Sequence, residues 1–411
     1  MLDRYQQLLL DILHRDPTRP DREQFMDFQP ADWEALTSAA IRYRLASQVH
    51  AYLTANSDLA LRLPAHCCKG LQGTLKAQLN RNFEQYRRLC TVLQACASAG
   101  LPIILLKGLW LVEHIYRDPK ARPSGDIDLL IHPDDMASFT RIARELSCSV
   151  PNGIANLQLL APASNEYPLM YKNNETRLDV HWSIAHPLIE QPIDEQSIWD
   201  RSEATTVGGV PCRTLKLEDN LLYLCFHTAI HHRFVHVGAR ALLDIAQMIA
   251  QPPRVIDWGD LVVRAQDLGW ARGTWITLDL VREHLGIAPP DSVLTALRPD
   301  DAPNENVRAK AMEILFLDQH TAVTPENLLR LTDAPWNRKV SLLWHRAFPS
   351  RDEVATQFNV PLGQRNFWIY YVRRLGRLLI HLPRLWAMVR DDMWQQGEMA
   401  RTRVVRNWLG N

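Results

Sequence analysis

Apolar residues recur at intervals of three and four along the first hundred positions, which is the spacing of amphipathic helices. One such pattern begins at Trp33, directly after Asp32, whose side chain is expected to cap the helix. A longer pattern runs through residues 71–99 and stops at Gly100, a residue type common at helix ends. Residues 1–100 are therefore predicted to form a helical N-terminal domain with a supporting role.

The hydrophobic pattern changes between residues 101 and 215. Residues 101–106 form an uninterrupted apolar run, as in a strand buried on both faces. The alternation of strand-like and helix-like runs predicts an α+β core, residues 101–215, with a mixed sheet. Further strands are expected at 126–131, 167–171 and 177–182, and helices at 109–116 and 136–146.

Helical periodicity returns after residue 215, so residues 216–411 are predicted to form a helical C-terminal domain. Segment 288–305 is rich in Pro and Asp and is expected to be a loop or hinge. The expected helices are 219–233, 239–250, 258–268 and 275–285.

Two aspartates, Asp126 and Asp128, flank Ile127 at the start of one expected strand. Because side chains alternate along a strand, both carboxylates project from the same face. Two carboxylates this close repel each other and raise each other's pKa unless a cation keeps both ionised. A hard divalent ion such as Mg²⁺ prefers oxygen ligands of this kind. Asp179 lies in the strand-like run at 176–181. If that strand lies beside the first, the three carboxylates form a cluster that could hold two metal ions.

Four features follow one another between residues 101 and 182: an apolar strand, the Lys107-Gly108 turn opening a helix, the acidic strand and a third acidic strand. This order resembles the nucleotidyltransferases of the polymerase-β superfamily. Within that superfamily it is most similar to a largely uncharacterised bacterial branch, which carries Lys-Gly where most relatives carry Gly-Ser. The resemblance is weaker at Asp32-Trp33 and over residues 220–248. It rests on residues 103–110, 122–131 and 178–182, together with Tyr116.

The resemblance implies a polymerase-β-like core flanked by helical domains, and a metal-dependent transfer of a nucleoside monophosphate. The transferred group is expected to be AMP from ATP, although no residue of the motif identifies the base of the nucleotide. Magnesium or manganese would be held by Asp126, Asp128 and Asp179, which would also be the catalytic residues. Lys107 and Gly108 would bind the phosphates of the nucleoside triphosphate, by positive charge and by close backbone approach at the helix start. The acceptor is expected to be a hydroxyl or phosphate of a small molecule, sugar or peptide.

Other polar residues near the motif allow more than one interpretation. Lys107 could point to solvent instead of phosphate. Arg122 could be a surface loop residue or a nucleotide ligand delivered from the loop before the acidic strand. His181 shares the face of Asp179 by strand periodicity, so it could contact the nucleotide, orient a carboxylate or be a structural histidine.

Histidines gather in the expected helix at 219–233. His227 and His231 lie four residues apart, a spacing that can bind zinc, although no Glu follows His227 as it does in zinc proteases. The favoured interpretation places these histidines on the helical domain, facing the nucleotide cleft and helping to close it. A zinc hydrolase centred on them is the alternative.

The 411-residue chain carries 46 basic and 46 acidic residues, so its net charge of +0 gives no electrostatic reason to expect nucleic acid as a partner. No apolar run reaches the length of about 18 residues that a membrane span needs, and the N-terminus lacks the order of a secretory signal. Seven cysteines without a Cys-x-x-Cys pair are expected to be reduced thiols. A cytoplasmic protein is therefore expected.

The C-terminal tail, residues 364–411, is basic, with nine arginines against three acidic residues. Trp368, Tyr371 and three leucines (375, 378 and 379) could form the apolar face of a helix. Such a helix can bind a membrane surface or an acidic partner, but packing on its own domain is favoured. The basic tail makes a membrane-docked assembly factor one alternative to an enzyme. A nucleotide-binding regulator without turnover is another alternative.

Overall fold

The computed structural model contains one large buried apolar core, which extends from Leu8 near the N-terminus to Val405 near the C-terminus. The core is therefore shared by the N-terminal helices, the sheet and the C-terminal helices, and the division into three domains stays a prediction. The structure describes residues 2–16, 18–20, 23–149, 165–171, 176–185, 193–317, 351, 354, 366–373, 376 and 392–410.

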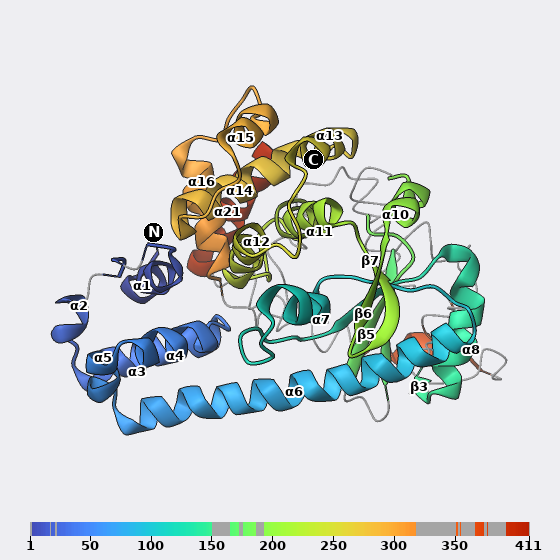
Figure 1. Ribbon diagram of the computed structural model, residues 1–411, viewed down its shortest axis with the longest axis horizontal. Coiled ribbons are helices and arrows are strands. Elements are labelled where there is room, and N and C mark those ends of the chain that lie inside the picture. Colours follow the sequence, from blue (N-terminus) through green and yellow to red (C-terminus); the bar gives the residue numbers. More distant parts are fainter. Residues whose placement is uncertain are drawn as a thin grey trace.

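The first hundred residues are helical, as predicted. Helix α6 (Ala65–Ser98) spans 34 residues and runs along the lower side of the molecule in Figure 1. One face of it, which includes Leu71 and Leu89, is buried, and this packing stabilises a helix of such length. The preceding helices are α1 (Arg4–Leu13), α2 (Glu23–Met26), α3 (Pro30–Arg42), α4 (Ala46–Ala55) and α5 (Ser57–Arg62).

The prediction that Asp32 caps α3 is wrong by three positions. The helix begins at Pro30, after Gln29, and Asp32 lies inside its first turn. Its carboxylate accepts a hydrogen bond from the backbone N–H of Gln29 at 2.9 Å. The acid therefore still stabilises the helix start, but from the third helical position.

A sheet of seven strands, counted over the described residues, confirms the predicted α+β class with mixed strand directions. The strand order is β3-β4-β5-β2-β1-β7-β6. Strand β2 pairs in parallel with β5 and antiparallel with β1, and β1 pairs in parallel with β7. The strands are β1 (Ile104–Leu105), β2 (Ile127–Leu130), β3 (Cys148–Ser149), β4 (Glu166–Tyr171), β5 (Thr176–His181), β6 (Glu203–Val207) and β7 (Val210–Thr214).

The hairpin of β6 and β7 has no counterpart among the predicted strands. Its residues are largely exposed or half-buried, so the alternation of apolar and polar positions that marks a strand is weak there. The turn at Gly208 and Gly209 places both residues at positive φ, which glycine tolerates. The helices within and after the strand region are α7 (Gly108–Leu111), η1 (Val112–Tyr116), η2 (Pro133–Asp135), α8 (Met136–Glu145) and α10 (Glu195–Arg201).

The C-terminal region is helical as predicted, with one correction. Segment 288–305 is not only a loop, because helix α15 (Asp291–Leu297) forms inside it and buries Val293, Leu294 and Leu297. The helices are α11 (Leu217–Cys225), η3 (Phe226–His231), α12 (Arg240–Ala250), α13 (Trp258–Asp267), α14 (Ala271–Leu285), α15 (Asp291–Leu297), α16 (Glu305–Leu315) and α21 (Asp392–Leu409).

The described end of the basic tail packs on the protein itself. Helix α21 lies against α16, and Arg401 forms an ion pair of 2.8 Å with Glu313. Trp408 donates from its indole N–H to the carbonyl oxygen of Asp301 at 2.8 Å. This supports the packing interpretation for α21, whereas the three leucines of the predicted apolar face lie outside the described residues.

All seven cysteines lie in described stretches and none forms a disulfide, in agreement with the expected free thiols. Among the described residues, no helix combines the length and the apolar character needed to cross a membrane.

Candidate active site

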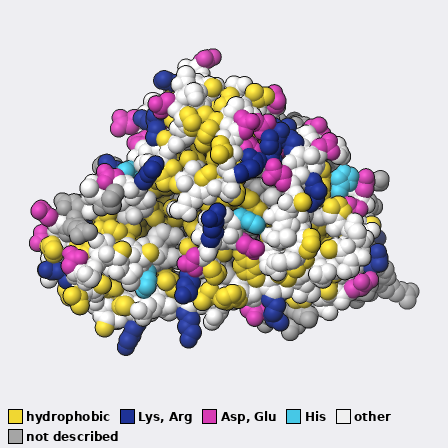
Figure 2. All heavy atoms as spheres, viewed as in Figure 1, with side chains coloured by type: hydrophobic (Ala, Val, Ile, Leu, Met, Phe, Trp, Pro, Cys, Tyr) yellow, Lys and Arg dark blue, Asp and Glu magenta, His cyan; other side chains and the backbone are white. Residues whose placement is uncertain are grey.

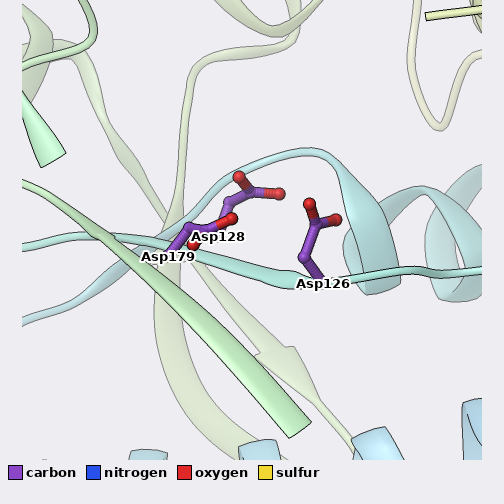
Figure 3. Close-up of side chains that lie close together, drawn as sticks. All are labelled: Asp126, Asp128 and Asp179. Atoms are coloured by element: carbon purple, nitrogen blue, oxygen red, sulfur yellow. The ribbon is translucent and has the colours of Figure 1, made fainter. Parts of the chain in front are cut away.

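Three aspartates meet near the middle of the sheet. Strands β2 and β5 are parallel neighbours, and their register places Asp128 directly beside Asp179. Figure 3 shows the carboxylates of Asp126 and Asp128 rising from the same side of the chain, with Asp179 next to Asp128. One carboxylate oxygen of each residue lies within 4.8 Å of the other two.

The acidic strand is held in register by its apolar positions. Ile127 and Leu129 alternate with the aspartates and are buried in the core. A slip of one residue would bring these side chains to the acidic face and the carboxylates into the core, so the register is strongly specified.

Helix α6 holds the loop that leads into Asp126. Asn82 is fully buried, and its side-chain N–H groups donate to the carbonyl oxygens of Pro119 and Arg122, each at 2.8 Å. Its Oδ1 accepts from the backbone N–H of Ser124 at 3.0 Å. The side-chain amide of Asn82 therefore fixes the loop by hydrogen bonds to three of its backbone groups.

Asp128 is buried between two basic side chains. Lys107 Nζ lies 3.2 Å and His181 Nε2 lies 3.3 Å from its Oδ1. Burial opposes ionisation, but the charge of Lys107 and the hydrogen bond from His181 outweigh it and lower the pKa of Asp128 to about 2. Its other oxygen, Oδ2, is buried and has no hydrogen-bond partner among the described residues.

The pKa of Asp179 is shifted in the opposite direction. Burial raises its pKa to about 6, the negative charges of Asp128 and Glu166 add to this rise, and Arg177 opposes it. Arg177 Nε donates to Asp179 Oδ1 at 2.6 Å. A carboxyl group that titrates this close to neutrality can exchange a proton during a reaction.

The donor set fits a hard divalent metal ion. Carboxylate oxygens are the ligands that Mg²⁺ and Mn²⁺ prefer, and the unpartnered Oδ2 of Asp128 is costly to bury unless a cation or a donor binds it. Within the described part of the chain, Asp126, Asp128 and Asp179 are the one group of three or more His, Cys, Asp or Glu residues close enough to share an ion.

The Lys107-Gly108 turn has both residues at positive φ, 22° and 46°. Such values favour glycine, so the backbone of Lys107 is strained. The turn places the lysine beside Asp128 with its side chain only 15% exposed, so the solvent-facing alternative for Lys107 is wrong. Figure 2 shows basic, acidic and histidine side chains close together in the middle of this face of the molecule.

His181 lies between two acidic residues. Its Nε2 faces Asp128, and its Nδ1 lies 3.0 Å from Glu166 Oε2. Burial would lower the pKa of His181, but the two carboxylates raise it. The geometry thus favours the interpretation that His181 orients a carboxylate, and a nucleotide contact stays a prediction.

His227 and His231 lie within the π-helical turn η3, which continues α11, and His232 follows it directly. His227 Nε2 lies 2.8 Å from Lys107 Nζ and 3.2 Å from His232 Nε2, and its ring stacks on His231 with centroids 5.7 Å apart. Burial, and next the charge of Lys107, hold the pKa of His227 well below its usual value. His227 therefore faces the acidic cluster through Lys107, whereas no set of three ligand atoms close enough to share an ion includes these histidines among the described residues.

Arg122 is neither a surface residue nor an unengaged cation at the cluster. It is 4% exposed, and its guanidinium donates to both oxygens of Asp244, at 2.8 and 2.9 Å. A third hydrogen bond, of 3.1 Å, goes to the carbonyl oxygen of Gly108. The surface alternative is therefore wrong, and the observed contacts connect the loop before Asp126 to α12. Nucleotide binding by Arg122 stays a prediction.

Three residues that shape the site were not predicted from the sequence: Arg177, Glu166 and Asp244 in these roles. Arg177 stands two positions before Asp179, so strand periodicity could have placed it on the same face. Glu166 and Asp244 reach the site through pairing and packing that no local pattern reveals.

A family model described as an uncharacterised nucleotidyltransferase matches residues 29–286. The matched range runs from the start of α3 through α14 and contains every site residue described above. No curated protein and no solved structure matches the chain.

Proposed function

Because the chain belongs to the family of uncharacterised nucleotidyltransferases, we propose that it transfers a nucleoside monophosphate from a nucleoside triphosphate to an acceptor and releases pyrophosphate. The observation that carries the proposal is the meeting of three carboxylates on the paired strands β2 and β5, beside a buried lysine. Clusters of this kind hold the metal ions of phosphoryl-transfer sites.

Asp126, Asp128 and Asp179 would hold Mg²⁺ or Mn²⁺, and the bound ion would neutralise charge on the substrate phosphates. Lys107 adds a positive charge next to the cluster, and burial fails to neutralise it because Asp128 and Asp126 raise its pKa. Gly108 lets the backbone approach a phosphate at the start of α7. These residues therefore position and stabilise the triphosphate.

In the proposed reaction, an acceptor oxygen forms a bond to the α-phosphorus while the bond from that phosphorus to pyrophosphate breaks. A hydroxyl acceptor loses a proton in this step. Asp179, the cluster carboxylate that also accepts a hydrogen bond from Arg177, is proposed to take the proton. His181 would keep Asp128 oriented through its hydrogen bond.

We further propose that residues 101–215 form a polymerase-β-like core, that ATP is the donor and that the protein acts in the cytoplasm. The acceptor is proposed to be a small molecule, a sugar or a peptide. The balanced charge of the chain supports this choice over a nucleic acid acceptor.

A thermal-shift screen with ATP, GTP, CTP and UTP, with and without Mg²⁺, tests the proposal. Stabilisation is expected only when nucleotide and metal are both present, and it is expected to vanish in the Asp126→Asn/Asp128→Asn double variant. Pyrophosphate release then separates an enzyme from a regulator that binds nucleotide without turnover. The absence of any nucleotide-dependent shift would contradict the proposed function.

A further inference from the structure

Lys107 joins the acidic cluster to the histidines. Its Nζ lies 3.2 Å from Asp128 Oδ1 and 2.8 Å from His227 Nε2. An ammonium group has three N–H donors. With these two acceptors engaged, one donor has no acceptor among the described residues and is available to a ligand.

The backbone around His227 is held in an unusual conformation. The π-helical turn η3 ends at His231, and Arg233 and Phe234 follow with φ of 49° and 66°. The backbone N–H of His232 donates to the carbonyl oxygen of His227 at 3.1 Å. π-helical turns and left-handed residues are costly and concentrate at functional sites.

The position of Lys107 depends on both of its partners. A buried ammonium group must keep hydrogen-bond acceptors. Without the imidazole of His227, the remaining attraction comes from the carboxylates, chiefly those of Asp128 and Asp126. The ammonium would then move toward the oxygens that are needed by a metal ion.

We propose that His227 is a positioning residue for the substrate triphosphate: it accepts a hydrogen bond from Lys107 and so holds the ammonium beside the acidic cluster, with one N–H directed to a phosphate oxygen. The inference rests on the proposed nucleotidyl transfer and adds a residue to the same site. His227 acts through a neutral acceptor atom, so a glutamine amide oxygen should replace it and an aliphatic side chain should not.

Binding of inorganic triphosphate in the presence of Mg²⁺, measured by calorimetry on the full-length protein, tests the inference. This probe carries the phosphates common to every donor and requires no knowledge of base or acceptor. His227→Leu is expected to weaken binding about tenfold, the effect of losing one hydrogen bond to a charged group. His227→Gln is expected to stay within about threefold of the wild type.

Two further variants show whether the effect passes through Lys107. In a Lys107→Met background, His227→Leu should add no further loss, because the group it positions is absent. His231→Leu, in the same helical turn, controls for a general disturbance of that turn. His227→Met replaces His227→Leu if the leucine variant does not fold.

The outcomes separate this inference from the proposed function. Unchanged binding in His227→Leu, an equal loss in His231→Leu, or a further tenfold loss in the Lys107→Met background would overturn the role of His227 and leave nucleotidyl transfer standing. A wild-type protein that binds neither triphosphate nor nucleotide would overturn both.

Discussion

The three aspartates of the site stand in different electrostatic surroundings. Asp128 is buried against Lys107 and His181, Asp179 is buried with a raised pKa, and Asp126 is half-buried at the end of the loop held by α6. An ionised ligand and a proton acceptor can therefore coexist in one cluster, because the pKa of each carboxylate is set by its own neighbouring groups.

The two aspartates of β2 should differ when each is replaced by asparagine, although both variants should lose turnover. Asp128→Asn removes the buried anion that lies between Lys107 and His181, so the free energy of unfolding should fall by roughly 2–4 kcal/mol. Asp126→Asn should change it by less than about 1 kcal/mol. Urea denaturation in EDTA measures both, and equal destabilisation would contradict these environments.

Asp179 should make the metal-free protein less stable as pH rises. Its folded pKa of about 6 lies above its ordinary value of 3.8, so the folded state binds the proton more tightly. The stability this provides is complete below pH 3.8 and is lost as pH rises through 6. Relative to the wild type, Asp179→Asn should thus gain roughly 2 kcal/mol between pH 4 and 7.5.

Urea denaturation of the wild type and Asp179→Asn across this range, in EDTA, checks the expected difference. Comparing the two proteins at each pH cancels the titration of all other groups. If the free energies of unfolding of the two proteins differ by the same amount at every pH, the pKa of Asp179 has its ordinary value. The same substitution should also remove the stabilisation by metal and nucleotide, since it removes a proposed metal ligand.

At the scale of elements, α6 acts as a frame for the site. It contributes buried apolar residues to the core and one buried amide, Asn82, to the loop before Asp126. The loop carries no strand pairing of its own between α7 and β2, so its shape depends on such contacts. A helix that looks purely structural therefore helps to place the acidic strand.

Asn82→Ala should weaken metal binding and lower stability by roughly 2–4 kcal/mol, because it leaves two carbonyl oxygens and one N–H of the loop without partners. Asn80→Ala, an exposed position on the same helix, is the matched control and should be neutral within about 0.5 kcal/mol. Chemical denaturation and Mn²⁺ titration measure the two effects. Equal behaviour of the two variants would exclude the framing role.

Across the whole molecule, the strand region and the C-terminal helices are joined by a buried ion pair. Arg122 from the loop before β2 meets Asp244 on α12, and the hydroxyl of Tyr116 donates to the same carboxylate at 2.8 Å. Figure 1 shows α12 among the helices that stand above α7 and the sheet. The pair thus couples the position of the acidic loop to the packing of the helices.

Asp244→Ala should destabilise the protein by roughly 3–5 kcal/mol, because it leaves the buried guanidinium of Arg122 unpaired. The double variant Arg122→Met/Asp244→Leu should recover much of that loss, since neither charge then remains buried. Thermal and urea denaturation of the single and double variants form the test. A double variant no more stable than Asp244→Ala would argue against the ion pair as the source of the loss.

The sequence alone was sufficient wherever the cause is local. Strand periodicity placed Asp126 and Asp128 on one face, and apolar spacing located most of the helices within a few residues. It missed hairpin β6–β7 and α15, where apolar spacing is weak or prolines suggest a loop. Asp179 could be proposed as the third ligand, because the family resemblance supplied the strand order that periodicity cannot.

Only the tertiary structure decided which distant residues surround these groups. Arg122 meets Asp244 and Lys107 meets His227 across more than a hundred positions of the chain. The packing of α12 beside η1 and the approach of η3 to the Lys107 turn allow these contacts, and the pairing of β2 with β5 places Asp179 beside Asp128. All three depend on the global fold. Burial and neighbouring charge then move the pKa values of Asp128 and Asp179 in opposite directions, although the residue type is the same.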